Sequence, residues 1–178
     1  MKILLVYGSP RKNGNTAMLA DQFRKGALEN GHEVISYYLY EKNILHCLAC
    51  DYCQSHKGEC IQKDDFLSAY ELLQSSDMLV IAAPVYYLGL PGNIKVFIDR
   101  TYAESAVGRH VTKAALLTAA CKEAPDVTKV MVDYYEKLTT YLGWNNLGTV
   151  SAYGVAGIGE VKDNLCMEQA YLLGKSLL

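Results

Sequence analysis

Residues 8–16 of this chain, Gly-Ser-Pro-Arg-Lys-Asn-Gly-Asn-Thr, have the composition of an anion-binding turn. They follow a short apolar run at 3–7 and precede a helical pattern that begins near Ala17. A turn between a strand and a helix start directs backbone N–H groups and the positive end of the helix dipole to one place. The side chains that add donors or positive charge are Ser9, Arg11, Lys12, Asn15 and Thr16. The segment therefore predicts a phosphate site.

The spacing of the glycines limits which phosphate this turn can hold. Five residues separate Gly8 from Gly14, and Asn15 stands where a Walker loop would carry its lysine. The dinucleotide fingerprint is absent as well. The pattern favours a monophosphate at one end of a larger ligand. The alternative is a turn whose Gly and Asn supply only left-handed geometry, although capping alone does not require Ser, Arg, Asn and Thr together.

A second loop has the chemistry to hold a flat aromatic ligand. It follows the apolar run Met78–Ala83 and reads Pro84, Val85, Tyr86, Tyr87, Leu88, Gly89. Proline ends the strand, glycine lets the backbone approach closely, and the tyrosine and leucine side chains offer apolar faces to a ring. The alternative is a tyrosine-rich surface turn or a subunit contact.

Four of the six cysteines form a cluster, Cys47, Cys50, Cys53 and Cys60. Three cysteines at two-residue intervals resemble the first part of a bacterial ferredoxin sequence, which predicts ligands for a [4Fe–4S] cluster. A zinc site that includes His46 or His56, and unligated or redox-active thiols, are the alternatives. Cys121 and Cys166 lie apart and are interpreted as packing residues, with Cys121 close to the predicted ring.

Strand and helix patterns alternate along the chain and must position these residues. Strands are predicted at Lys2–Tyr7, Glu33–Leu39, Met78–Ala83, Ala114–Ala119 and Leu147–Tyr153. Helices are predicted at Thr16–Asn30, Phe66–Gln74, Gly92–Ala106, Asp126–Leu142 and Asn164–Leu177, with stops at Gly31 and Gly143. Such alternation predicts an α/β fold with a parallel sheet and helices on both faces.

By analogy with flavodoxin, the expected strand order is 2-1-3-4-5, with the ligand beyond the carboxyl ends of the strands. The phosphate turn and the loop at 84–89 then lie side by side. This adjacency favours a flavin-like ring over a surface turn.

Composition excludes several classes of function. The chain has 178 residues, which fits a single domain at 1–178, and 51% of them are hydrophobic. A net charge of -2 gives no electrostatic reason to expect nucleic acid or an anionic membrane as a partner. No apolar run approaches the roughly 20 residues of a membrane span. The first apolar run is too short for a signal peptide, and six cysteines in a chain without a leader predict a cytoplasmic protein.

Three motifs together resemble the NAD(P)H-dependent FMN reductases of the flavodoxin-like superfamily. They are Gly8-Ser9-Pro10-Arg11 with Gly14-Asn15-Thr16, then Ala83-Pro84-Val85-Tyr86, then Ile98-Asp99-Arg100. The four-cysteine segment at 46–60 is similar to that of the iron–sulfur flavoprotein-like branch, in whose pattern the gap before Cys60 fits. The likeness is strong from Met1 to about Tyr102.

The resemblance implies roles for particular residues. It implies that Ser9, Arg11, Asn15 and Thr16 bind the FMN phosphate, that residues 84–89 line the isoalloxazine, and that Thr118 and Ala119 approach its opposite edge. Asp99–Arg100 matches a family pair and is either a surface ion pair or part of a dimer interface. The glycines at 154, 157 and 159 are interpreted as a flexible loop near the site.

The expected activity follows from the same resemblance. It implies electron transfer from NAD(P)H through FMN to a quinone, an azo or nitro compound, or a flavin, in a homodimer or higher homo-oligomer. The alternative is a non-enzymatic electron carrier with an iron–sulfur cluster on the four cysteines. No triad or carboxylate pair is recognisable, so no catalytic side chain is predicted and the chemistry is assigned to the flavin.

Overall fold

The computed structural model describes all residues from 1 to 178 and contains one parallel sheet. Its strands are β1 (Lys2–Tyr7), β2 (Glu33–Tyr38), β3 (Met78–Pro84), β4 (Lys113–Ala119) and β5 (Asn145–Ala152). Their order is β2-β1-β3-β4-β5, which confirms the flavodoxin-like prediction.

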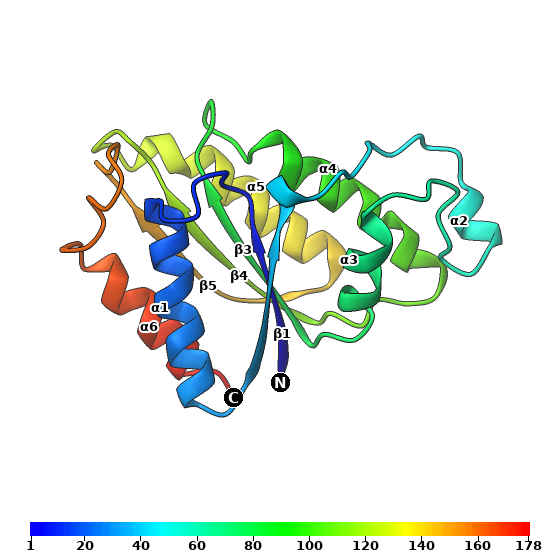
Figure 1. Cartoon of the computed structure of the whole chain (residues 1–178), viewed down its shortest axis with the longest axis horizontal. Coiled ribbons are helices and arrows are strands. Elements are labelled where there is room, and N and C mark those ends of the chain that lie inside the picture. The colour runs from blue at the N-terminus through cyan, green and yellow to red at the C-terminus, as the bar shows by residue number, and fades with distance from the viewer.

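Helices cover both faces of the sheet (Figure 1). The α-helices are α1 (Asn15–Glu29), α2 (Tyr52–Ser55), α3 (Phe66–Leu73), α4 (Gly92–Arg100), α5 (Asp126–Leu142) and α6 (Cys166–Lys175). Short 3₁₀ turns are η1 (Leu39–Glu41) and η2 (Thr101–Ala106). No helix combines the length and the apolar character that crossing a membrane requires.

One predicted helix is shorter in the structure for a local reason. The helix expected at Gly92–Ala106 ends at Arg100, and the chain tightens into η2 where the Thr101 hydroxyl donates to the Ile98 carbonyl at 2.8 Å. The predicted stops are confirmed: Gly31 and Gly143 have φ of 79° and 73°, the left-handed conformation that glycine adopts most readily after a helix.

Alternating residues of the buried strands build two separate cores. Ile3 and Leu5 of β1 face α1 and α6, where Phe23 is fully buried. Leu4 and Val6 face α3, α4 and α5. Because β1 is apolar on both sides, its position in the sheet interior is fixed. The loops that follow β1, β3, β4 and β5 consequently lie along one edge, and the labelled termini lie at the other (Figure 1).

Helices α1 and α6 approach each other at two glycines. A Cβ added to Gly174 would lie 2.1 Å from the Phe23 carbonyl oxygen, and one added to Gly26 would lie 2.1 Å from that of Tyr171. Neither backbone atom can rotate away as a side chain would. This contact fixes α1, whose first turn follows the predicted phosphate turn, against the helix that follows β5.

We therefore expect Gly174→Ala to destabilise the chain by about 1–3 kcal/mol, because the new methyl group overpacks the helix contact. Gly92→Ala is the matched control, since a Cβ at Gly92 meets no atom within 4 Å. Urea unfolding of the two variants and the wild type measures the difference. Equal stability of Gly174→Ala and Gly92→Ala would show that α1 and α6 can move apart to accommodate the added methyl group without loss of stability.

Candidate functional site

The turn after β1 folds tightly before α1 begins. The Gly14 N–H donates to the Arg11 carbonyl at 3.0 Å, and the Arg11 N–H donates to the Ser9 hydroxyl at 3.2 Å. Gly14 caps α1, and a Cβ on it would lie 2.9 Å from the Arg11 Cβ. The first N–H groups of α1 have no intrahelical acceptor and carry the positive end of its dipole. The turn is therefore shaped to receive an anion.

A cavity of about 290 Å³ joins this turn to the ends of β3 and β4. Among the residues predicted for the cofactor, those that line it are Ser9, Arg11, Asn15, Thr16, Pro84, Val85, Tyr86 and Ala119. Gly14, Cys121, Val155 and Ala156 complete the lining. The structure thus brings the polar turn and the apolar loop into one hollow, as expected from the adjacent strands.

The two cations of the turn have different partners. Lys12 pairs with Glu41, and its ammonium group lies 5.7 Å from the centre of the Tyr38 ring. Arg11 makes no ion pair within the chain and lines the cavity. Arg11 is therefore the cation that remains available to a bound anion.

The loop after β3 turns back on itself beyond the cavity. Tyr86 and Gly89 exchange two backbone hydrogen bonds of 3.0 Å, with Tyr87 and Leu88 between them at φ of 48° and 67°. Non-glycine residues in this conformation cost about 1 kcal/mol or more each, and such strain concentrates at functional loops. Tyr87 is fully exposed at the tip, so Tyr87, Leu88 and Gly89 do not line the cavity.

Two other predicted residues have surroundings that the sequence did not show. Thr118 is fully buried, and its hydroxyl faces the Met131 sulfur at 3.8 Å, because neighbouring residues of a strand point to opposite faces. The Asn15 side chain hydrogen-bonds to the loop at 155–161 rather than pointing freely into the cavity. That loop carries Val155 and Ala156, so the glycine-rich segment does lie at the site.

The cysteine segment does not form a metal centre in this structure. All six cysteines are free, and no group of three or more His, Cys, Asp or Glu side chains converges on a point that could hold a metal ion. The segment includes the short helix α2, which the sequence analysis missed, and three non-glycine residues with positive φ, Ala49, Asp51 and Lys57. The cluster ligands predicted at Cys47, Cys50, Cys53 and Cys60 are therefore not brought together.

The remaining two cysteines lie in different environments, although both were interpreted as packing residues. Cys166 is buried, and its thiol donates to the Ser151 carbonyl at 3.2 Å, which confirms a packing residue. Cys121 is exposed and lines the cavity, so its interpretation as a packing residue is wrong. It lies two residues after the end of β4, and the carboxyl end of that strand opens onto the cavity.

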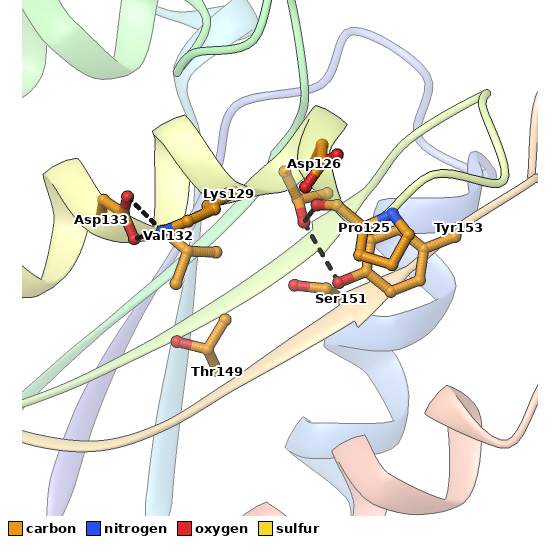
Figure 2. A pocket seen from close by; sticks show the side chains of 9 residues that line it. Pro125, Asp126, Lys129, Val132, Asp133, Thr149, Ser151 and Tyr153 are labelled. Carbon is orange, nitrogen blue, oxygen red and sulfur yellow. Dashed lines mark hydrogen bonds and ion pairs between the residues drawn. The ribbon is translucent and has the colours of Figure 1, made fainter.

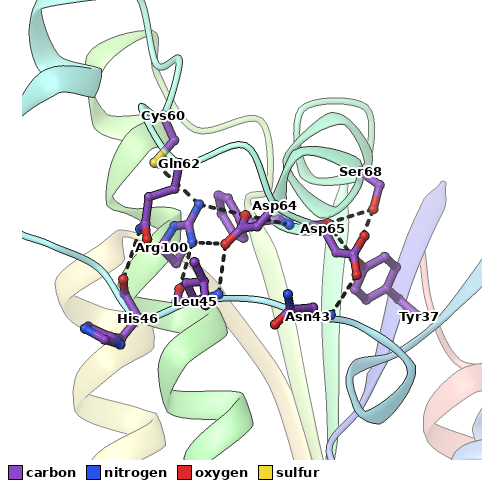
Figure 3. Close-up of polar contacts among 11 residues, drawn as sticks. Tyr37, Asn43, Leu45, His46, Cys60, Gln62, Asp64, Asp65, Ser68 and Arg100 are labelled. Carbon is purple, nitrogen blue, oxygen red and sulfur yellow. Dashed lines mark hydrogen bonds and ion pairs between the residues drawn. The ribbon is translucent and has the colours of Figure 1, made fainter.

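Arg100 closes the base of the cysteine segment (Figure 3). Its buried guanidinium donates to both Asp64 carboxylate oxygens at 2.7 and 3.0 Å, to the Leu45 carbonyl at 2.7 Å and to the Cys60 sulfur at 3.4 Å. Asp99, its predicted partner, instead pairs with Lys95 one helical turn away. Asp99 and Arg100 therefore do not pair with each other: Arg100 forms a buried ion pair with Asp64, and Asp99 forms a surface ion pair with Lys95.

A larger hollow of about 430 Å³ lies between α5 and β5, and Figure 2 shows its lining. Four of its polar side chains pair with each other, Lys129 with Asp133 at 2.7 Å and the Thr128 hydroxyl with that of Tyr153 at 3.2 Å, while the buried Thr149 hydroxyl has no partner. None of the residues predicted for the cofactor lines it. The smaller cavity, which combines Arg11 with the first N–H groups of α1, is the better candidate site for an anionic ligand.

We expect Asp64→Asn to destabilise the chain by about 3 kcal/mol, because it leaves the buried guanidinium without its countercharge. Burial alone would raise the pKa of Asp64, but hydrogen bonds from Arg100, Leu45 and Phe66 outweigh it and lower the pKa. A carboxyl group whose pKa is lowered by folding stabilises the fold at pH values above its unfolded-state pKa, and this stabilisation is lost as the pH falls. The difference in unfolding free energy between Asp64→Asn and the wild type should therefore shrink below about pH 4.

Urea unfolding over this pH range measures the effect of Asp64→Asn. Asp99→Asn is the matched control, because its exposed pair with Lys95 should contribute less than about 1 kcal/mol. If both variants lose the same small amount at every pH, the Arg100 clasp does not stabilise the segment.

Comparison with known proteins places this geometry in a family. The family model described as NADPH-dependent FMN reductase matches residues 1–151. An iron–sulfur flavoprotein of Archaeoglobus fulgidus is 40% identical over 100 residues, which are 56% of this chain and 45% of the relative. Another from Methanocaldococcus jannaschii is 24% identical over 186 residues, covering 99% of this chain and 95% of the relative.

Solved structures agree on the fold. An NAD(P)H:quinone oxidoreductase from Methanothermobacter marburgensis superposes with a TM-score of 0.79 at 18% identity, covering 98% of this chain and 94% of the other. Most of the curated relatives align along only part of their length, and the chain spans about half of it. Since the family model covers most of the chain, including the turn and the cavity residues from Ser9 to Cys121, this chain belongs to the NADPH-dependent FMN reductase family.

Proposed function

We propose that the chain is an FMN-dependent oxidoreductase that takes electrons from NAD(P)H and passes them to a quinone, an azo or nitro compound, or a flavin. The observation that carries this proposal is the single cavity that joins the anion turn of residues 8–16 to the apolar loop after β3. A phosphate at one end and a flat apolar ring at the other match its two kinds of wall.

The residues present fit the ends of FMN. The hydroxyls of Ser9 and Thr16, the Arg11 guanidinium and the first N–H groups of α1 supply donors and charge for a phosphate. Pro84, Val85, Tyr86 and Ala119 supply apolar walls for the ring. The cavity contains no acidic side chain to repel the phosphate.

When bound, FMN supplies the hydride chemistry that protein side chains lack. The chain's contribution is to hold and orient. The N–H groups of Val85 and Tyr86 already donate to Ala119 and Gly89 at 3.0 Å, so they stiffen the wall instead of reaching toward a ligand. No side chain is assigned as a general acid or base.

The family resemblance also predicts a homodimer or higher homo-oligomer in the cytoplasm. These expectations stay predictions, as does the choice of acceptor. The quinone reductase that shares the fold is too distant in sequence, at 18% identity, to assign its substrate to this chain.

Arg11→Ala tests the phosphate end of the site. We expect FMN affinity to fall about 10–100-fold, the equivalent of one charged hydrogen bond, while riboflavin, which lacks the phosphate, changes less than about twofold. Lys12→Ala is the matched control, because Lys12 is engaged by Glu41. Quenching of flavin fluorescence measures all the affinities.

Three results would count against the proposal. Wild-type protein that binds neither flavin would remove the site. If Arg11→Ala loses the same factor of affinity for FMN and for riboflavin, the phosphate lies elsewhere. Flavin-loaded protein that fails to oxidise NADH and NADPH with a quinone present would remove the reductase activity while leaving the binding site.

A second candidate function, electron carriage through an iron–sulfur cluster, is favoured by the names of the curated relatives. The cysteines in this structure do not fit a cluster, because no three of them converge. Iron and sulfide analysis of protein purified without oxygen decides between the two. About four iron and four sulfide per chain would support the carrier, whereas none, together with bleaching of the flavin by NAD(P)H, supports the reductase alone.

A further inference from the structure

The Asn15 side chain uses every hydrogen-bonding position it has within the protein. Its amide nitrogen donates to the carbonyls of Val155 and Gly157 at 3.1 and 2.8 Å. Its oxygen accepts from the N–H groups of Gly159 and Val161 at 3.0 and 3.3 Å. An asparagine side chain offers two donors and two acceptor positions. Asn15 therefore has none left for a ligand unless it releases the loop.

These four bonds join segments that are far apart in the sequence. Asn15 begins α1, and residues 155–161 follow β5 by way of a glycine-rich turn. Both segments line the same cavity, one with Ser9 and Arg11 beside Asn15, the other with Val155 and Ala156. Whatever moves this loop therefore changes the shape of the cavity.

The loop has few other attachments near its centre. The Val155 N–H donates to the Ala120 carbonyl at 3.0 Å, and the Ala156 N–H donates to the Glu160 carboxylate at 2.7 Å. Ile158 at the tip is largely exposed, and Gly159 has a φ of 87°. Without Asn15, the backbone hydrogen bonds left between 157 and 161 would be short-range turn bonds, and only the buried side chains of Val155 and Val161 would still hold the two ends of the loop in the core.

We infer that Asn15 is a positioning residue that acts on flavin through the loop at 155–161, not a ligand of the phosphate. The inference rests on the proposed flavin site and changes the role that the family resemblance implies for this residue. Flavin binding is coupled to the order of the loop, because the amide holds the cavity wall formed by Val155 and Ala156. Val155 and Ala156 line the same cavity as Tyr86, so the coupling extends to flavins without a phosphate.

The first experiment needs no ligand. We expect the Gly159 and Val161 amides of the unliganded full chain to exchange with solvent deuterium about tenfold faster in Asn15→Ala than in the wild type. Asn30→Ala is the matched control: Asn30 caps the other end of α1, and its amide donates to the Leu177 carbonyl at 2.6 Å. It should leave both exchange rates unchanged. Unchanged rates in Asn15→Ala would overturn the inference.

The second experiment separates a positioning residue from a phosphate ligand. Asn15→Ala should lower the affinities for riboflavin and for FMN by the same factor, about tenfold. A loss confined to FMN would mean that Asn15 contacts the phosphate and would overturn the inference. If the wild type binds neither flavin, the proposed function fails, and the coupling fails with it. Normal wild-type binding with an unaffected Asn15→Ala variant overturns this inference alone.

The dependence of riboflavin affinity on pH distinguishes the proposed role of Asn15 from a general loosening of the fold. Ionised Asn15→Asp keeps acceptors for Gly159 and Val161 but has no N–H for Val155 and Gly157. Its riboflavin affinity should rise several-fold as pH falls toward about 4, because the protonated carboxyl can again donate to a carbonyl. Asn15→Ala and the wild type should show no matching rise. A flat profile for Asn15→Asp would contradict a role for the donated bonds.

Discussion

The unpaired N–H groups at the start of α1 are the feature on which the rest of the site depends. They are useful only if the helix is held in place, and two constraints hold it. Its apolar face packs against one face of the sheet, and at Gly26 its backbone meets that of α6. Because the contact joins backbone to backbone, the position of the anion turn is set by the core and not by flexible side chains.

The parallel sheet then determines what can face this turn. Strand order places the carboxyl end of β3 beside that of β1, and β4 beside β3. The loop after β3 supplies Val85 and Tyr86 to the cavity, and the carboxyl end of β4 supplies Ala119. A polar end and an apolar end in one hollow are a consequence of connectivity, since each strand contributes only the loop that follows it.

The cysteine segment is built on a different principle. It extends away from the sheet and is closed at its base by a buried ion pair between Arg100 and Asp64, with Arg100 also bonded to Leu45 and Cys60 (Figure 3). A buried pair costs desolvation of both charges, so it persists where its geometry is good and its remaining donors are satisfied. These contacts of Arg100 hold the two ends of the cysteine segment together, and Cys47, Cys50, Cys53 and Cys60 remain free thiols.

The sequence alone determined the alternation of strands and helices and the helix stops at Gly31 and Gly143, because apolar periodicity and turn residues are local signals. The strand order, and with it the convergence of the turn with the loop after β3, was expected only by analogy with flavodoxin. The sequence could not show which donors are already in use. Asn15 bonds to residues about 140 positions later, Lys12 pairs with Glu41, and Arg100 pairs with Asp64 instead of its neighbour Asp99. Such pairings depend on distances between separate elements, which only the tertiary structure decides.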